Sequence, residues 1–152
     1  MNLLLDTNII LSIVRAKKVR EILKFINPDY VPVYLSIVSV AEIKSFALRK
    51  KWGIKRLEFL DGFLQSTEII DINKSFINTY AEIDAFSQRA NPNLDNFTFD
   101  TPRNMGKNDL WIASLAALLG LKLVTTDSDF DHLHNVFFEV RKIKPEEFIQ
   151  FF

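Results

Sequence analysis

Short apolar runs alternate with amphipathic stretches along this chain, and the two patterns predict strands and helices in turn. Apolar or β-branched runs predict strands at residues 2–6, 33–38, 68–72, 121–126 and 136–143. Apolar residues recurring every three or four positions predict helices at 7–15, 17–26, 39–51, 54–65, 74–89 and 108–119, with a short helix after Pro145. This alternation predicts an α/β fold, a three-layer α/β/α sandwich with a mainly parallel central sheet.

Residues 90–107 interrupt the alternation. This stretch, ANPNLDNFTFDTPRNMGK, has no apolar period and contains two Pro, one Gly and four Asn. We expect a long polar loop, a feature that is often functional in compact domains. Because no other stretch resembles a linker and no repeat is present, we expect one domain over residues 1–152.

Composition removes several kinds of site. The 152 residues contain no Cys and only two His, which excludes disulfides, thiolate catalysis and Cys-ligated zinc. Lys+Arg and Asp+Glu both number 19, so net charge gives no reason to propose a nucleic-acid partner, although a local basic stripe is enough for binding. The 14 Phe indicate a large aromatic core or an apolar face that a partner covers. With neither a signal peptide nor a run of about 20 apolar residues, we expect a cytoplasmic protein.

Four acids fall where the predicted sheet would gather them. Asp6 and Asp127 each end a strand, and Glu42 lies just after the strand 33–38 in the first turn of its helix. Asp109 lies in the first turn of the helix that precedes strand 121–126. Sites in open parallel sheets form outside the carboxyl ends of the strands. Carboxylates meeting there would repel one another unless a cation lies among them, and Mg²⁺ or Mn²⁺ prefers oxygen ligands and suits phosphoryl chemistry.

Each acid also has an interpretation that needs no cation. Glu42 can close a capping box with Ser39, and that role can coexist with metal binding. Asp109 is favoured by the helix dipole at a first turn, and residues 127–131 read as a solvated turn. Asp6 is the hardest to explain in this way, because an acid between apolar runs needs a partner.

Two histidines and a tryptophan could also take part in catalysis or base stacking, but we give them structural interpretations. We interpret His132 and His134 as surface loop residues, because metal-assisted hydrolysis does not require them. Trp111, at the start of its helix, is interpreted as a packing residue rather than a base-stacking platform.

Four motifs together resemble the PIN-domain family. They are LLLDTNII at the start, SVAEI around residue 42, KNDLWIAS around residue 109 and LVTTDSDFDHL from residue 123. Their order, spacing and predicted context fit the family over nearly the whole chain. The compact form resembles a VapC-type toxin, the ribonuclease half of a toxin–antitoxin pair. The resemblance implies an α/β/α sandwich and a Mg²⁺- or Mn²⁺-dependent endoribonuclease whose products carry 5′-phosphate and 3′-hydroxyl ends.

The resemblance also assigns roles to residues. Asp6, Glu42, Asp109 and Asp127 match the acidic quartet that binds metal and carries catalysis, and Asp129 matches an additional acid of some members. Thr7 and Asn8 match a polar pair that orients a ligand carboxylate or a metal-bound water.

Two features depart from the family pattern, namely the long 90–107 loop and the absence of a strongly basic total. RNA must then be held by local charge, for which a solvated surface is the alternative interpretation. The candidates are Arg15, Lys17, Lys18 and Arg20, then Lys44, Arg49, Lys50 and Lys51, and finally Arg103 and Lys107.

Two other functions remain open. The chain can act mainly as a catalytically weak interaction partner, since VapC-like proteins form homodimers and bind a cognate antitoxin, and the FIQFF tail fits an apolar binding face as well as a core. A receiver-like phosphoacceptor domain also uses acids around Mg²⁺, but its late-strand lysine and lone acceptor Asp are not evident here.

Overall fold

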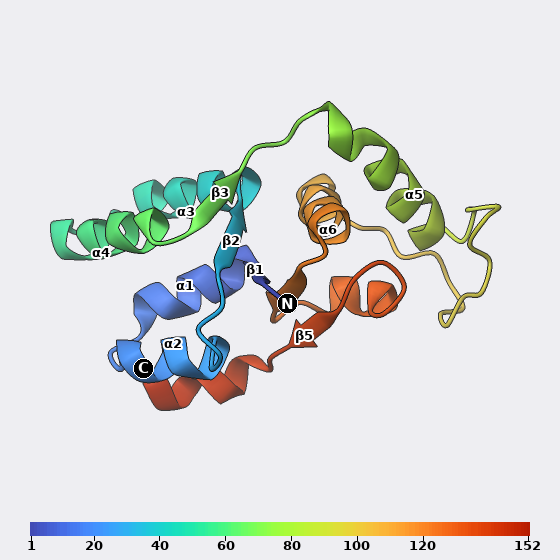
Figure 1. Ribbon diagram of the computed structural model, residues 1–152. Helices are drawn as coiled ribbons and strands as arrows, with labels where there is room; N and C mark the ends of the chain where they lie inside the picture. The colour runs from blue at the N-terminus through green and yellow to red at the C-terminus, as the bar shows by residue number, and fades with distance from the viewer.

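A five-stranded parallel sheet forms the centre of the protein (Figure 1). The computed structural model describes residues 1–152. The strands are β1 (Leu3–Leu5), β2 (Val33–Ser36), β3 (Glu68–Ile70), β4 (Lys122–Thr125) and β5 (Val140–Lys142), in the order β3-β2-β1-β4-β5. Each neighbouring pair is parallel, so all strands end at the same edge of the sheet. The predicted α/β fold is confirmed.

Helices cover both faces of the sheet. The α-helices are α1 (Thr7–Arg15), α2 (Val19–Ile26), α3 (Ile37–Arg49), α4 (Ile54–Gln65), α5 (Ile77–Ser87) and α6 (Lys107–Leu119). Three 3₁₀ segments are η1 (Lys74–Phe76), η2 (Ser128–Leu133) and η3 (Pro145–Phe151). In Figure 1, α1 to α4 and the C-terminal segment lie on one side, and α5 and α6 lie on the other. None of these helices has the length and apolar character needed to cross a membrane.

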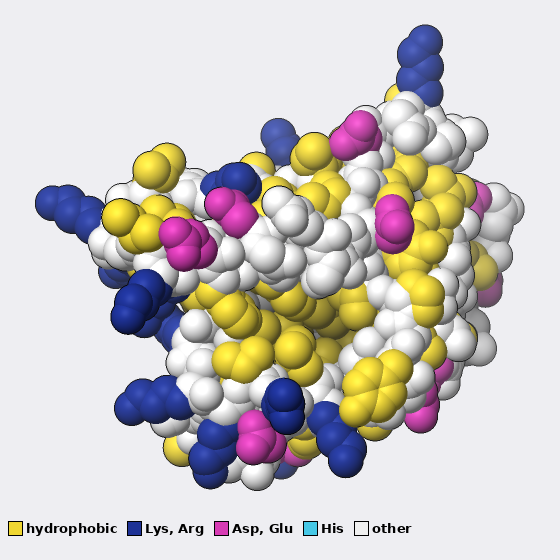
Figure 2. Space-filling view, turned by 60° about the vertical axis from the view of Figure 1, so that its left-hand side comes forward, with side chains coloured by type: hydrophobic (Ala, Val, Ile, Leu, Met, Phe, Trp, Pro, Cys, Tyr) yellow, Lys and Arg dark blue, Asp and Glu magenta, His cyan; other side chains and the backbone are white.

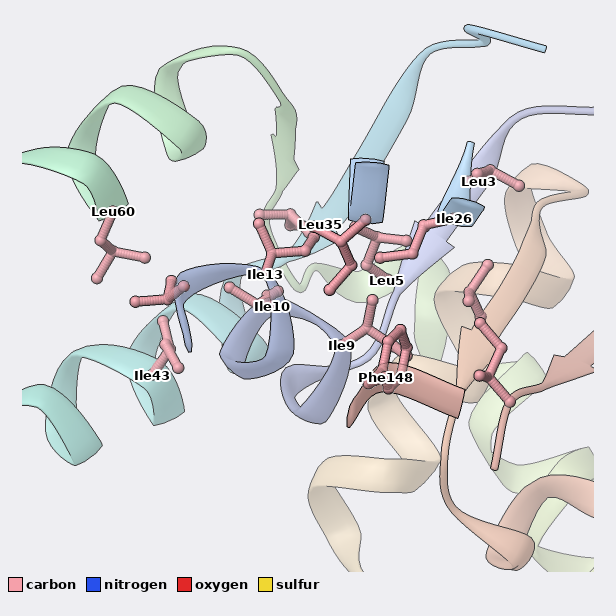
Figure 3. Close-up of a cluster of buried hydrophobic side chains, with 14 of the residues drawn as sticks. Leu3, Leu5, Ile9, Ile10, Ile13, Ile26, Leu35, Ile43, Leu60 and Phe148 are labelled. Carbon is pink, nitrogen blue, oxygen red and sulfur yellow. The ribbon is translucent and has the colours of Figure 1, made fainter. Parts of the chain in front are cut away.

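The central strand divides the core in two. Leu3 and Leu5 of β1 belong to one cluster and Leu4 belongs to the other, because successive side chains of a strand point to opposite faces. Figure 3 shows the first cluster, in which Leu5 lies near Ile13 of α1, Ile26 of α2 and Leu35 of β2, and Ile43 of α3 lies farther from the strand. The second cluster joins Leu4 to α5, α6 and η2. Burying each of these side chains fully contributes about 1.5–3 kcal/mol, so β1 is held firmly between both layers.

The start of α3 differs from its prediction. Strand β2 ends at Ser36, whose hydroxyl caps the helix by accepting a hydrogen bond from Val38 N at 3.1 Å. Ser39 therefore lies inside the helix, fully buried, with no hydrogen-bond partner for its hydroxyl. The predicted capping box between Ser39 and Glu42 is wrong, because β-branched Ile37 and Val38 extended the apparent strand by two residues.

The C-terminal prediction also needs correction. Strand β5 covers only residues 140–142 rather than 136–143, because the preceding residues turn and Val140 N donates to His134 Nδ1 at 2.9 Å. Phe148 and Phe151 are buried in the first core cluster, whereas Ile149 and Phe152 are 65% and 44% exposed, so the FIQFF tail is part core and part exposed apolar surface. The carbonyl of Phe151 also accepts from the backbone N–H groups of Lys17 and Lys18, and α2 begins only after them.

Residues 88–106 form no regular helix or strand, as predicted for 90–107, but the segment is not purely polar. Phe97 and Phe99 pack against Phe86 of α5 with ring centroids 5.4 and 5.5 Å apart. The backbone N–H of Arg103 donates to the Ser87 carbonyl at 2.7 Å. The loop is thus anchored by its own aromatic residues before it reaches α6.

Candidate metal centre at the carboxyl edge of the sheet

Asp6 lies at the point where the chain leaves β1 for α1. It is 5% exposed, and both carboxylate oxygens are held: Oδ1 accepts from Thr7 N at 2.8 Å and Oδ2 accepts from Thr125 Oγ1 at 2.7 Å. Burial raises the pKa of Asp6 above its ordinary value, although these two hydrogen bonds oppose the shift. The two hydrogen bonds therefore hold the carboxylate in one direction, and its burial leaves it poorly solvated.

Asp6 and Asp127 come together because β1 and β4 are neighbours. The chain leaves β1 toward β2 on one side and returns through β4 on the other, so this pair of strands is the topological switch point of the sheet. Thr125, the last residue of β4, links the two acids, since its hydroxyl also accepts from Asp127 N at 3.0 Å.

Glu42 approaches from the second turn of α3, not the first turn as expected, because the helix begins at Ile37. Burial and the negative charge of Asp6 raise its pKa. The nearby Thr7 hydroxyl partly offsets this shift without completing a hydrogen bond, and Thr7 Oγ1 remains buried and unpartnered.

Asp109 projects from the first turn of α6, after Gly106 at the N-cap. Burial, the largest cause, and the negative charges of Asp6, Asp127, Asp129 and Glu42 together raise its pKa to about 7. All five carboxylates therefore interact at this edge of the sheet.

Asp127 and Asp129 belong to one turn after β4. Asp127 caps η2, its Oδ1 accepting from Asp129 N at 2.9 Å, so the interpretation of this segment as a turn is correct for the backbone. Carboxylate oxygens of Asp109, Asp127 and Asp129 nevertheless lie within 4.8 Å of one another. Asp131 is separate from the cluster, because it pairs with Lys142 at 2.7 Å.

No basic side chain neutralises the cluster. The ion pairs of the structure join Lys44 to Asp61, Lys122 to Glu139 and Lys142 to Asp131, and none includes one of the five acids. An all-oxygen donor set, mutual repulsion and the unpartnered Thr7 hydroxyl fit a hard divalent cation such as Mg²⁺ or Mn²⁺. The arrangement is suited to binding a cation and the phosphate groups that accompany it.

A groove of about 540 Å³ opens beside the acids, between α1, α3 and the start of α6. Thr7, Asn8, Glu42 and Asn108 line its end at the cluster, and Phe46 and Arg49 also line it. Asn8 is thus exposed at the mouth of the site, next to the acid that its neighbour Thr7 helps to hold.

The histidines do not behave alike. His132 is predicted on the surface, but it is 4% exposed, and its Nε2 lies 2.7 Å from Ser87 Oγ. Burial and the charge of Arg103 lower its pKa to about 4. The prediction is wrong because the partners of His132, including the stacked ring of Phe86, come from a distant helix. His134 is exposed as expected.

Trp111 packs as predicted, with its ring centroid 4.3 Å from that of Tyr80.

The basic candidates are scattered around the site. Arg103 donates from its guanidinium to the Ser128 carbonyl at 2.8 Å, beside the acid turn, and Lys107 is the first residue of α6. Lys44 faces α4 and pairs with Asp61.

Arg15 lines a neighbouring groove that shares Asn8 and Leu11 of α1 with the groove beside the acids, and Lys17 follows that helix. Sequence reasoning missed Thr125 as the link between Asp6 and Asp127, and it missed Phe46 at the groove. A threonine two residues before the acid at the end of the strand was the available signal for the first, and the helical spacing of Glu42 and Phe46 was the signal for the second.

Comparisons with known proteins agree with this architecture. A chain of VapBC2 from Rickettsia felis, solved bound to a DNA fragment from their promoter, superposes with a TM-score of 0.69 at 23% identity, over 93% of this chain and 98% of that one. VapBC-1 from nontypeable Haemophilus influenzae gives 0.68 at 21%, with the same coverage. VapBC-5 from Mycobacterium tuberculosis, of the VapBC family of toxin-antitoxin systems, gives 0.58 at 23%, over 94% and 98%.

At these identities the structural likeness establishes the fold. No curated protein matches the sequence. The family model for the PIN domain matches residues 3–135, a span that includes all five acids of the cluster. The chain therefore belongs to the PIN domain family.

Proposed function

We propose that this chain is a metal-dependent endoribonuclease and the toxin of a type II toxin–antitoxin pair. The observation that carries the proposal is the group of five carboxylates at the switch point, which the structure leaves without any basic partner. The membership of the chain in the PIN domain family supports the same chemistry.

In this proposal Asp6, Glu42, Asp109 and Asp127 hold Mg²⁺ or Mn²⁺, with Asp129 as a further ligand. The bound cation would supply an activated water and charge stabilisation for hydrolysis of an RNA phosphodiester. Thr125 and Thr7 N hold the Asp6 carboxylate in one direction, which preorganises it for this role.

Asp109 has a separate consequence for proton balance. With a pKa of about 7, its carboxyl carries a proton in much of the metal-free protein at neutral pH. Asp109 must release this proton to act as a ligand, so cation affinity is expected to rise between pH 6 and pH 8.

Cleavage of total cellular RNA tests the proposal. Purified protein is incubated with Mg²⁺, Mn²⁺ or EDTA, and the ends of the fragments are mapped. We expect discrete metal-dependent fragments with 5′-phosphate ends, absent with the Asp6→Asn/Asp109→Asn protein. Asp131→Asn is the matched control, because Asp131 pairs with Lys142 outside the cluster. Undiminished cleavage by Asp6→Asn, purified free of other nucleases, would refute the proposal.

A second candidate is a mainly protein-binding role, with an antitoxin or a second copy as partner. A groove of about 460 Å³ between α2, α4 and the 27–33 segment is lined mostly by hydrophobic residues, including Leu23, Tyr30 and Phe63. Figure 2, which brings the left-hand side of Figure 1 forward, shows a hollow floored by hydrophobic side chains, with Lys and Arg mainly to its left and below it and Asp and Glu on the ridge above it. The solved relatives are components of VapBC systems, which favours an antitoxin.

Co-expression with the protein encoded next to this chain tests that candidate. Tyr30→Asp is expected to prevent co-purification and leave RNA cleavage intact, because Tyr30 is 78% exposed and lies away from the acids. A chain that is monomeric in scattering and recovers no partner would remove the binding role.

A further inference from the structure

The groove beside the acids extends beyond the residues that would bind metal. From Thr7, Glu42 and Asn108 it runs along α3 to Phe46 and Arg49. Its floor is apolar, with Leu11 and Val38 among the lining residues. A polar catalytic mouth that continues into an apolar trough is more than a cation site requires.

One face of α3 lines this trough in sequence order. Glu42, Ser45, Phe46 and Arg49 are spaced by three, one and three residues, which places them on the same side of the helix. The rise from the first to the last is about 10 Å. The helix therefore presents an acid, a hydroxyl, an aromatic ring and a guanidinium along one wall.

The far end of the trough combines aromatic rings with positive charge. The Arg49 guanidinium and the Lys50 ammonium lie 5.6 and 5.8 Å from the centroid of the half-buried Phe46 ring. Trp52 supports the ring from its edge, with centroids 5.9 Å apart. Both cations are near the outer limit of about 6 Å for a cation–π contact, so they do not cover the ring closely.

We propose that the trough holds a segment of single-stranded RNA next to the cleavage site, with a base stacked on Phe46 and a phosphate bound by Arg49. This inference rests on the proposed nuclease function. Stacking on an aromatic ring together with an arginine that contacts the backbone is the usual way in which proteins hold single strands.

The charge and polarity of the trough favour RNA over a hydrophobic protein segment. Asn8 and Asn108 offer polar contacts at its mouth and Ser45 offers one on its wall, and exposed Arg49 lines its far end with Lys50 beside the Phe46 ring. The groove between α2 and α4, in contrast, is lined mostly by hydrophobic residues and lies away from the acids. An apolar helix of a partner protein would provide no negative charge to match the positive end of the trough.

Binding measurements test the subsite without depending on cleavage. A fluorescein-labelled, unstructured RNA oligonucleotide is titrated with the Asp6→Asn protein, and binding is followed by anisotropy. The same titration is repeated with Asp6→Asn proteins that also carry Phe46→Leu, Phe46→Tyr, Arg49→Gln or Lys24→Gln. Phe46→Leu is expected to weaken binding about 10-fold, whereas Phe46→Tyr, which keeps an aromatic ring, retains it. Arg49→Gln is expected to weaken binding and to reduce the salt slope by about 0.7, the value for one phosphate of a single strand.

Lys24→Gln is the control, because Lys24 is exposed on α2, lies outside the trough and is not one of the candidate RNA-binding residues. Equal losses with Lys24→Gln and Arg49→Gln would indicate diffuse charge and overturn the subsite. Unchanged RNA binding by folded Phe46→Leu and Arg49→Gln would also overturn it. The same conclusion would follow if these variants lost binding to a protein partner and kept binding to RNA. If the active protein cleaves no RNA, the nuclease proposal fails, while the anisotropy series still decides whether RNA occupies the trough.

Discussion

Substituting Asp109 by Asn should stabilise the metal-free protein at alkaline pH. The carboxyl has a pKa of about 7 in the folded protein and an ordinary value of 3.8, so folding takes up a proton between these values. Stability contributed by this group falls as pH rises from about 4 and becomes level above about 7. Asn is similar in shape and carries no charge, so the stability of the Asp109→Asn protein does not fall with rising pH in this way.

The size of the effect follows from the pKa. A tenfold change in the acid dissociation constant corresponds to about 1.4 kcal/mol, so the stability gap between Asp109→Asn and the parent should widen by at most about 3 kcal/mol between pH 5 and pH 8.5. Partial exposure of Asp109 reduces this to about 1–3 kcal/mol. A charge at the start of α6 is favoured by about 0.3–1 kcal/mol, which is smaller and opposite in sign.

Urea unfolding in EDTA at pH 5 and pH 8.5 measures the gap. The titration of His132 cancels, because both proteins contain it. Asp29→Asn is the control, since Asp29 is exposed in a turn and its side chain makes no hydrogen bond or ion pair. A gap that stays constant with pH, or that shrinks toward pH 8.5, would refute the reasoning that the acids repel one another in the absence of metal.

Three further predictions concern stability. Thr125→Val should cost about 1–3 kcal/mol in urea unfolding, because it leaves Asp6 Oδ2 and Asp127 N without their hydroxyl partner, whereas Thr125→Ser should retain most of the stability. The pKa of His132 is lowered to about 4, so the folded protein loses stability as pH falls from about 6.5 toward 4, and His132→Gln should reduce that loss by about 2 kcal/mol at pH 4.5. Gly120→Ala should cost about 1–2 kcal/mol because φ is +63°, while Gly62→Ala within α4 should stabilise by up to about 1 kcal/mol; thermal unfolding compares the two.

The position of the acids could be predicted because parallel topology constrains it. Asp6 and Asp127 each follow a strand, and parallel strands end at one edge, so no knowledge of side-chain contacts was needed. Asp109 was predictable for a related reason. Helix α6 returns the chain to the start of β4, and its own first turn must therefore lie near the carboxyl edge.

What the sequence did not reveal depends on contacts between distant segments. The burial of His132 requires Ser87, which is 45 residues away, and the loop aromatic residues that close over it. The start of α3 was misplaced because Ile37 and Val38 favour strands in isolation, while the Ser36 cap and the packing of α3 decide for helix. Local pattern therefore predicted the element types better than their boundaries.

The same topology explains why the positions of the acids are fixed by the fold, whereas the walls around them can differ. The acids on β1 and β4 are fixed by buried strands, and Asp6 is also tied to Thr125, so their positions follow from the fold itself. The walls of the site come from elsewhere: α3 supplies Phe46 and Arg49 on one side, and Arg103 of the 88–106 loop binds the Ser128 carbonyl on the other. Under the proposed nuclease function, changes in these walls alter which RNA segment reaches the acids without moving the acids. Substitutions on α3 and in the loop are then expected to change selectivity, whereas substitutions at the switch point are expected to remove cation binding.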